Sequence, residues 1–364
     1  MPPSSRRRAI DPSLHQQLIR GERRGAFASL ARGILWLLSL VFRVIVAVRG
    51  WLYDAGLLRR RQAGLPVISI GNLTTGGTGK TPVVIALARR LTARGERVAV
   101  LARGYGAARD GELNDELRLI GREVPEAILC PGKDRVARAA EAVSRGATAI
   151  LLDDGFQHRR LARDLDLVLL DATDPWGAGH LLPRGLLREP PGALARADAV
   201  ILSRAELKSA SELDALEAQV RGAGFAGPVL RMRVEPARLE RLHPEPADLE
   251  LGELAGKAVL LACGVGNPNA VAATAARLGV RTSQVQAFPD HHEYDGEDVL
   301  ALEELASRRA LGHVLVTAKD AVKLAPLLPG RARLTWLCLG VEARLEPVAA
   351  LDALLDRPAP QEAP

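Results

Sequence analysis

The sequence predicts an α/β protein in which a mostly parallel sheet is followed by a second, smaller α/β domain and preceded by an apolar helix. From Pro66 onward, short apolar runs alternate with Ala-, Leu- and Arg-rich stretches of helical period. Alternation of this kind is typical of parallel strands covered by helices on both faces. A glycine-rich loop follows the first apolar run, and a 15-residue apolar stretch, 34–48, lies near the N-terminus.

The expected elements of the first domain come in strand–helix order. Apolar runs predict strands at 66–70, 97–101, 148–152, 166–170 and 198–202, and helical periodicity predicts helices at 82–94 and 135–145. Four prolines interrupt residues 203–256, which we interpret as a connection with one helix near 211–222. A second set of strands follows at 257–262, 282–287, 313–317 and 334–339.

These patterns give five segments. We expect a basic N-terminal segment at 1–62 with its helix at about 30–57, a nucleotide-binding domain at 63–205 and a connection at 206–256. A C-terminal α/β domain is expected at 257–345 and a tail at 346–364. The last residues, 357–364, are Pro-rich and are expected to be disordered.

The net charge of +6 is concentrated at one end of the chain. Residues 1–62 hold twelve arginines against three acidic residues, a local charge of +9, so the remaining 302 residues carry −3. A protein that binds nucleic acid more often spreads its basic residues over the binding face, and we therefore expect no nucleic-acid partner. Basic residues that flank an apolar stretch are typical of a segment that binds a membrane surface with anionic lipids.

The apolar stretch 34–48 allows three interpretations. As a helix it would span roughly 22 Å, which is shorter than a hydrocarbon core of about 30 Å. Arg43 interrupts it, and no cleavage site for a signal peptide follows it. It is either a helix that lies in or partly enters the membrane, a buried helix packed on the domain, or a complete span.

The glycine-rich loop, Thr74-Thr-Gly-Gly-Thr-Gly-Lys-Thr81, lies between a predicted strand and a predicted helix, as a phosphate-binding P-loop does. Its backbone N–H groups and the helix N-terminus can surround phosphate oxygens. Lys80 would reach the β- and γ-phosphates, and the Thr81 hydroxyl would bind Mg²⁺. One residue departs from the usual pattern, because Thr74 stands at the position of the first glycine. The residues assigned to ATP are Thr74, Thr75, Gly76, Gly77, Thr78, Gly79, Lys80 and Thr81.

A pair of carboxylates ends the predicted strand at 148–152. Asp153 and Asp154 would lie at the carboxyl edge of the sheet, where P-loop enzymes hold Mg²⁺ directly or through water. Successive residues of a strand point to opposite sides, so the two are expected to have different roles. We assign Asp153, with Thr81, to the metal ion and Asp154 to the catalytic centre. The alternative is a strand followed by an acidic helix cap.

Eight short motifs follow one another along the chain. They are Gly71-Asn-Leu-Thr-Thr-Gly-Gly-Thr-Gly-Lys-Thr-Pro82, Arg103-Gly-Tyr-Gly106, Asn114-Asp-Glu116, Asp153-Asp-Gly-Phe-Gln-His158, Leu182-Pro-Arg-Gly-Leu-Leu-Arg-Glu189, Cys263-Gly-Val-Gly-Asn-Pro268, Phe288-Pro-Asp-His-His292 and Thr317-Ala-Lys-Asp-Ala-Val-Lys323. In this order they resemble the motifs of the tetraacyldisaccharide 4′-kinases, which phosphorylate a lipid A precursor. The resemblance covers residues 70–323. It implies MgATP-dependent phosphorylation of the 4′-hydroxyl of a lipid A disaccharide 1-phosphate at the cytoplasmic face of the bacterial inner membrane.

The resemblance also assigns a catalytic pair. Asp115 matches the family's aspartate that deprotonates the sugar hydroxyl, although Asn114 replaces the usual glycine before it. His291 matches the histidine that pairs with this aspartate, and His292 is the alternative. The adjacent histidines are also compatible with a metal-dependent phosphoesterase, but such a site needs further His or Asp ligands. Without the resemblance, Asp115 reads as a solvated loop carboxylate.

Arg184 and Arg188 are candidate partners for the anionic sugar phosphate, or else ordinary surface arginines. Two other functions compete with a lipid kinase. One is a membrane-recruited P-loop ATPase switch of the partitioning or site-selection type, which usually has a signature lysine where this chain has Thr75. The other is a soluble metabolic kinase or ligase, which leaves the basic, apolar N-terminus without a role. The sequence does not determine the oligomeric state or the acyl-chain preference.

Overall fold

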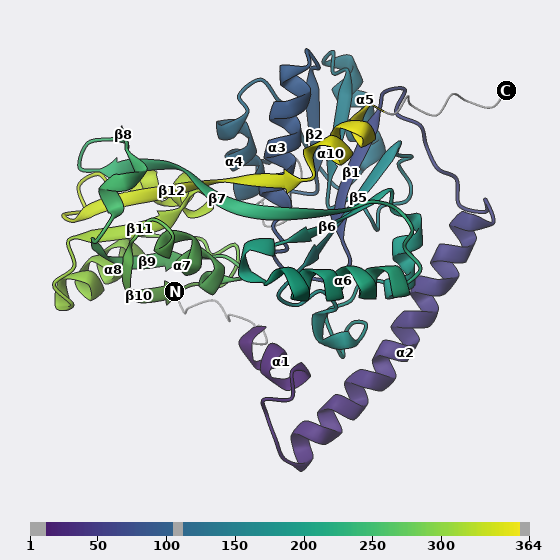
Figure 1. The fold of residues 1–364 in the computed structure, drawn as a ribbon, viewed down its shortest axis with the longest axis horizontal. Coiled ribbons are helices and arrows are strands. Elements are labelled where there is room, and N and C mark those ends of the chain that lie inside the picture. The colour runs from purple at the N-terminus through teal and green to yellow at the C-terminus, as the bar shows by residue number, and fades with distance from the viewer. Residues whose placement is uncertain (1–11, 105–111, 357–364) are drawn as a thin grey trace, which may run out of the picture.

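The computed structural model describes residues 12–104 and 112–356, which form two lobes joined by a pair of long strands, with a long helix along one side (Figure 1). The strands are β1 Val67–Asn72, β2 Val98–Ala102, β3 Ile128–Pro131, β4 Ala149–Asp153, β5 Leu165–Asp171, β6 Ala199–Ser203, β7 Val229–His243, β8 Ala247–Leu249, β9 Ala258–Cys263, β10 Arg281–Ala287, β11 His313–Thr317 and β12 Thr335–Glu346. The helices are α1 Pro12–Ile19, α2 Ala26–Asp54, α3 Lys80–Ala93, α4 Asp115–Glu123, α5 Arg135–Ser144, α6 Ala210–Gly222, α7 Pro268–Ala276, α8 Gly296–Arg308, α9 Ala318–Leu324 and α10 Val348–Leu355.

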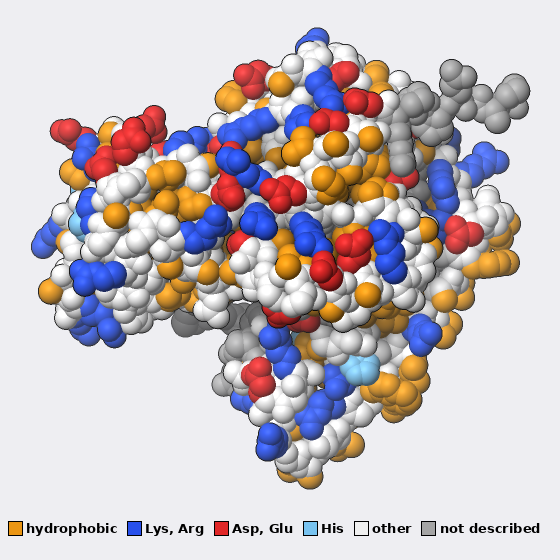
Figure 2. Space-filling model, viewed as in Figure 1, with side chains coloured by type: hydrophobic (Ala, Val, Ile, Leu, Met, Phe, Trp, Pro, Cys, Tyr) orange, Lys and Arg blue, Asp and Glu red, His pale blue; other side chains and the backbone are white. Residues whose placement is uncertain are grey.

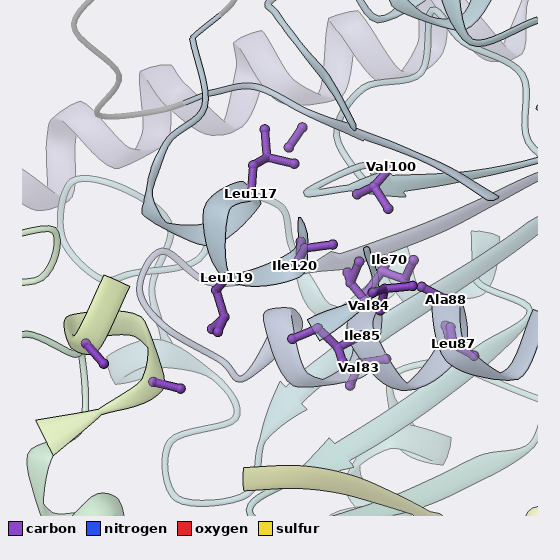
Figure 3. Packing of buried hydrophobic residues seen from close by; sticks show 14 of the residues in the cluster. Ile70, Val83, Val84, Ile85, Leu87, Ala88, Val100, Leu117, Leu119 and Ile120 are labelled. Carbon is purple, nitrogen blue, oxygen red and sulfur yellow. The ribbon is translucent and has the colours of Figure 1, made fainter. Parts of the chain in front are cut away.

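The N-terminal lobe is a parallel sheet in the order β3-β2-β4-β1-β5-β6-β7. Because side chains alternate along a strand, each strand contributes to two cores. Ile68 and Ile70 of β1 belong to the core under α3 and α4, where Figure 3 shows Ile70, whereas Val67 belongs to the core under α5. The second face also carries α6, over β5 and β6. This two-sided covering explains the continuous apolar runs of the strands.

The C-terminal lobe repeats the arrangement on a smaller scale. Strands β10, β9, β11 and β12 run parallel, with α8 and α9 on one face and α7 on the other. One apolar cluster continues from α3 and α4 of the first lobe to α8 and α9 of the second. The two lobes therefore share a core on this side of the sheet.

Strands β7 and β12 connect the lobes as an antiparallel ribbon. The first residues of β7 pair with β6, and the rest pair with β12 from Arg231 to His243. The register shifts where Pro236 faces Val341, at a bulge that a proline tolerates. After β12 the chain returns to the first lobe as α10, where Arg90 and Arg94 of α3 form ion pairs with Asp352.

Most of the predicted strands lie within one or two residues of the observed ones. The prediction for 203–256 was wrong in one respect, because this region contains β7, the longest strand of the described chain, as well as α6. β7 lacks a continuous apolar run because most of its residues are only half-buried. Pro236 within it also argues against a strand at the level of the sequence. The expected tail likewise contains α10, whereas residues 357–364 lie outside the described chain. The domain boundaries remain a prediction.

Candidate functional site

The P-loop joins β1 to α3 and forms one wall of a large cleft. Gly79 caps α3 with a φ of 86°, and the Thr78 hydroxyl accepts a hydrogen bond from Asn72 Nδ2 at 3.1 Å. The start of the loop is held from outside: Thr75 N donates to Leu186 O at 2.8 Å, and Thr74 pairs with Leu187 in an antiparallel bridge. The loop is thus attached to a neighbouring segment before any phosphate binds.

Asp154 lies beside Lys80 on the same wall of the cleft. The Asp154 carboxylate lies 3.4 Å from Lys80 Nζ and accepts two hydrogen bonds from Arg188 Nη1, at 2.8 and 2.9 Å. Burial opposes ionisation, but the charges of Lys80 and Arg188 outweigh it and hold the pKa of Asp154 below its usual value. Arg188 therefore lies in the cleft beside the nucleotide-binding residues.

Asp153 has an environment that fits a divalent cation. Its side chain is buried, and no described residue forms a hydrogen bond with Oδ1. Burial, with the negative charge of Glu116, raises the pKa of Asp153 to about 7, a penalty that a bound cation would remove. Thr81 lines the same cleft. No cluster of three or more acidic, His or Cys side chains that could hold a metal ion occurs in the described residues.

The C-terminal lobe forms the opposite wall. The cleft has a volume of about 980 Å³. Its lining from this lobe includes Gly266, Asp290, His291 and Lys319. Gly266 lies directly against the P-loop, since a Cβ atom there would come within 3.1 Å of Gly77 N. The nucleotide-binding loop and the C-terminal lobe therefore face each other at contact distance.

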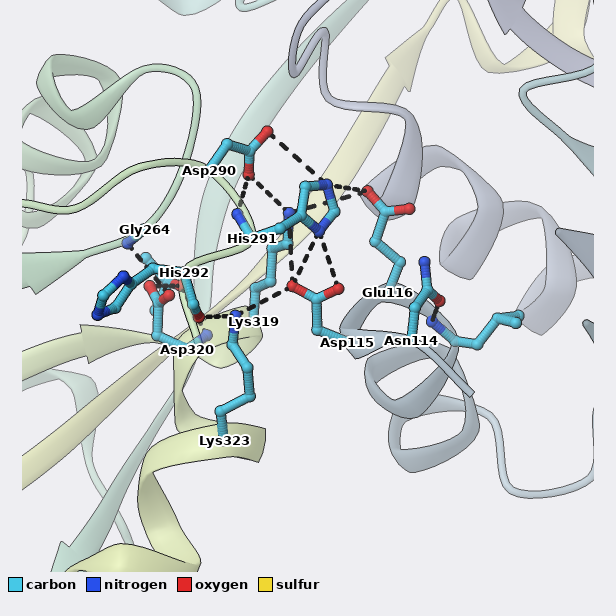
Figure 4. Close-up of polar contacts among 12 residues, drawn as sticks. Asn114, Asp115, Glu116, Gly264, Asp290, His291, His292, Lys319, Asp320 and Lys323 are labelled. Carbon is cyan, nitrogen blue, oxygen red and sulfur yellow. Dashed lines mark hydrogen bonds and ion pairs between the residues drawn. The ribbon is translucent and has the colours of Figure 1, made fainter. Parts of the chain in front are cut away.

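Asp115 meets His291 at the boundary between the lobes (Figure 4). Asp115 is the first residue of α4, whose cap Asn114 accepts a hydrogen bond from Leu117 N at 3.0 Å. His291 Nδ1 lies 3.0 Å from Asp115 Oδ1 and 3.2 Å from Oδ2. The Asp115 side chain is only 7% exposed and lies behind His291, which lines the cleft.

Two lysines of α9 complete the surroundings of Asp115. Lys323 Nζ lies 3.2 Å from Asp115 Oδ2 and 2.7 Å from the carbonyl oxygen of His292, and Lys319 Nζ lies 3.8 Å from Asp115 Oδ2. Burial alone would raise the pKa of Asp115, but the His291 hydrogen bond and the two ammonium groups outweigh it and hold the pKa well below its usual value. The hydrogen bond to Asp115 raises the pKa of His291 in turn.

His292 points elsewhere. Its ring stacks on Phe288 at 4.7 Å, and its Nε2 lies 2.9 Å from Asp298. Of the two adjacent histidines, His291 is therefore the one beside Asp115. The backbone at His291 is in the left-handed region, with a φ of 62°, and the two side chains point in different directions.

The sequence alone predicts no role for Lys319 and Lys323, although both lie in one of the eight motifs. Their spacing of four places both on one face of α9, and that face meets α4. Buried Asp320 fixes the helix: it bonds the Thr317 hydroxyl, Tyr294 OH and Gly264 N. The spacing of the two lysines was the available signal, but nothing in the sequence identified Asp115 as their partner.

Arg184 lies outside the cleft. Its Nη1 donates to the carbonyl oxygen of Ile19, at the end of α1, at 2.8 Å. The structure thus separates the two arginines that the sequence grouped together. Another residue that sequence reasoning missed is Arg204, which follows β6 and whose Nη2 donates to Gly77 O at 2.6 Å. Of the motif at 103–106, Tyr105 and Gly106 lie outside the described residues.

Comparison with known proteins gives one consistent result. A family model described as tetraacyldisaccharide-1-P 4′-kinase (LpxK) matches residues 31–359. The tetraacyldisaccharide 4′-kinase of Anaeromyxobacter dehalogenans is 44% identical over 341 residues, 89% of each chain, and that of Syntrophus aciditrophicus is 38% identical over 345 residues, 88% of this chain and 91% of the relative. Among solved structures, LpxK from Aquifex aeolicus in complex with ATP is similar with a TM-score of 0.69 at 28% identity, covering 89% of this chain and 98% of that one.

His158, also in the cleft, gives a prediction about acid stability. Burial and the charges of Arg135 and Arg163 lower the pKa of His158 to about 4, whereas an unfolded chain titrates near 6.5. As the pH falls from 6.5 to 4 the unfolded state takes up this proton first, so the folded state loses stability in that window. We expect His158→Gln to lose less stability than the wild type over this window, measured by urea unfolding at a series of pH values. Equal pH dependence for both proteins, with His243→Gln in β7 as the control, would contradict this assignment.

Proposed function

The chain belongs to the tetraacyldisaccharide-1-phosphate 4′-kinase family, and from this premise we propose that its cleft uses Asp115 and His291 as the proton-accepting pair of the transfer. The enzyme moves the γ-phosphoryl group of ATP to the 4′-hydroxyl of a tetraacyldisaccharide 1-phosphate, a step of lipid A biosynthesis. The observation that carries the proposal is the 3.0 Å contact between His291 and Asp115, which come from different lobes, with His291 lining the cleft that holds the P-loop.

The chemistry of the pair follows from its charges. Asp115 has a pKa well below neutral and is therefore ionised, so it can only accept hydrogen bonds, and His291 Nδ1 must donate to it. In this arrangement His291 orients the aspartate and faces the cleft, and the sugar hydroxyl gives up its proton to the pair. Phosphoryl transfer passes through a loose transition state, so a correctly placed acceptor of low basicity is sufficient.

The other wall binds the phosphates. The backbone N–H groups of the P-loop and Lys80 would offset the charge of the phosphoryl oxygens, and Asp154 would keep Lys80 and Arg188 in place. Thr81 and Asp153 are the residues that would hold Mg²⁺, which supplies positive charge that neutralises the phosphates when bound. Among the two arginines expected for the sugar phosphate, Arg188 remains a candidate because it lines the cleft, whereas Arg184 does not.

We further propose that the enzyme works at the cytoplasmic face of the bacterial inner membrane. Helix α2 is long and apolar enough to cross a membrane, and most of its large apolar side chains are exposed, as the hydrophobic surface along its edge in Figure 2 illustrates. A tetraacylated disaccharide is insoluble in water, so an enzyme that phosphorylates it must reach the lipid surface. A partitioning-type ATPase switch receives no support from the family match.

Asp115→Asn should abolish most of the transfer while preserving nucleotide binding. Loss of a proton acceptor in general base catalysis typically lowers turnover roughly 10²- to 10⁴-fold. The affinity for ATP should stay within about twofold, because Asp115 does not line the nucleotide-binding wall. Turnover is measured by transfer of labelled phosphate from ATP to tetraacyldisaccharide 1-phosphate, with the exposed Asp214→Asn as the control. Wild-type turnover in Asp115→Asn would exclude it as the acceptor, and a wild-type protein that labels no lipid would refute the proposed reaction.

Lys323→Met should move the pH profile as well as lower the rate. Removing the ammonium group that lies 3.2 Å from Asp115 leaves the carboxylate less stabilised, so the pKa of Asp115 rises and the acidic limb of the kcat profile moves to higher pH. Lys323→Arg keeps the charge and should restore the position of that limb better than it restores kcat. If Lys323→Met lowers kcat without moving the acidic limb, the lysine has only a structural role.

A further inference from the structure

Helix α2 touches the rest of the protein along a narrow seam. Its buried and half-buried positions recur at helical spacing, at residues 28, 31, 32, 35, 39, 42, 46, 50, 52 and 53, and its other positions are exposed. Within α2, all of which the structure describes, Ser39 is the buried residue, with 6% of its surface exposed. A polar residue is thus the most deeply buried point of an apolar helix.

Ser39 connects α2 to the segment 181–188. Its hydroxyl lies 3.0 Å from the carbonyl oxygen of Leu181 and accepts a hydrogen bond from Arg184 N at 3.1 Å. Helix α1, which together with α2 forms a helical hairpin, holds the same segment from a second side, because Arg184 Nη1 donates to Ile19 O at 2.8 Å and His15 Nε2 lies 2.9 Å from Pro183 O. Both α1 and α2 therefore hold residues 181–184.

The other end of this segment holds the nucleotide site. Leu186 O accepts the hydrogen bond of Thr75 N, Leu187 pairs with Thr74, and Arg188 binds Asp154. Only a few residues separate the contacts with the hairpin from those with the P-loop, and they form a closed turn. In that turn Leu182 N donates to Leu187 O at 2.9 Å, and a Cβ atom on Gly185 would come within 2.2 Å of His180 O. A turn packed this tightly transmits a displacement of one end to the other.

The C-terminal half of α2 also contacts a segment of the nucleotide site. Arg49 Nη2 donates to Gln157 O at 2.9 Å, and Arg159 Nη1 donates to Gly50 O at 3.1 Å. The side chain of Gln157 binds both Asn72 O and Arg188. The segment 181–188, which holds the middle of α2, carries Arg188, and the segment 154–159, which holds its C-terminal half, begins with Asp154.

We propose that Ser39 and Arg184 are positioning residues for the ATP site, so that the membrane-associated hairpin sets the position of the P-loop through residues 181–188. This inference goes beyond membrane association: the hairpin contributes to nucleotide binding even where no membrane is present. Arg184, which the sequence suggested as a ligand of the sugar phosphate, acts through the backbone of its own segment instead.

The test is Ser39→Ala in the full chain, assayed in detergent micelles, where recruitment to a membrane cannot limit the rate. The hydroxyl bridges two segments, and its loss should raise KM for ATP and the Kd of a fluorescent ATP analogue roughly three- to tenfold. Ser39→Thr keeps the hydroxyl and should restore binding. Ser29→Ala, which removes an exposed hydroxyl from the same helix, should have no effect. Co-sedimentation with vesicles should be unchanged in all three variants, because none of the three substitutions removes an apolar side chain or a positive charge from α2.

Arg184→Met gives an independent measurement. It should weaken ATP binding to a similar extent, and because both residues act on one segment, the double variant with Ser39→Ala should be less impaired than the two single effects predict by addition. The proposal is overturned if both single variants, melting within a few degrees of the wild type, bind ATP with wild-type affinity, or if only their vesicle binding falls. Failure of the proposed reaction looks different, because it appears as wild-type turnover in Asp115→Asn or as a wild-type protein that labels no lipid, whatever the ATP affinity of the Ser39 and Arg184 variants.

Discussion

The burial of the Asp115 carboxylate is the constraint on which the arrangement of the two lobes depends. A carboxylate removed from water is costly unless positive charge and hydrogen bonds replace the lost solvation. The N-terminal lobe supplies α4, which begins with Asp115, but His291, Lys319 and Lys323 all come from the C-terminal lobe. The charge is therefore compensated only when the lobes are docked, so the geometry that brings Asp115 and His291 together is also the geometry that the electrostatics favour.

The ribbon of β7 and β12 makes this docking reproducible. Each strand runs through both lobes, and the chain returns as α10 to α3, so the C-terminal lobe is attached to the first at both of its ends. On the α4 side, Arg238 and Glu240 of β7 form ion pairs with Glu123 and Arg122. Helix α4 is thus held at its C-terminus by the ribbon and at its N-terminus by α9, which leaves Asp115 little freedom to move.

The sequence predicted the elements that repeat a simple pattern and missed those that depend on distant partners. Buried parallel strands have continuous apolar runs, so their positions could be predicted to within one or two residues. β7 could not, because most of its residues are half-buried and polar residues alternate with apolar ones along it. The family resemblance named Asp115 and His291, but the lysines at 319 and 323 become meaningful only when α9 meets α4. Arg184 is the opposite case: the sequence suggested it as a partner of the sugar phosphate, whereas in the structure its side chain donates to a backbone carbonyl of α1.

The departure of the P-loop from its usual pattern has a structural reason in the same contacts. A glycine is required where the backbone adopts a positive φ, and Gly76 and Gly79 have φ values of 110° and 86°. Thr74 is buried and pairs with Leu187 in an antiparallel bridge, an extended arrangement that a β-branched residue favours. The loop therefore begins as a short strand against the segment 181–188. This attachment replaces the flexibility of a first glycine with a fixed connection to the segment that α1 and α2 also hold, and Thr74 is therefore the residue through which the proposed coupling of α2 to the P-loop would act.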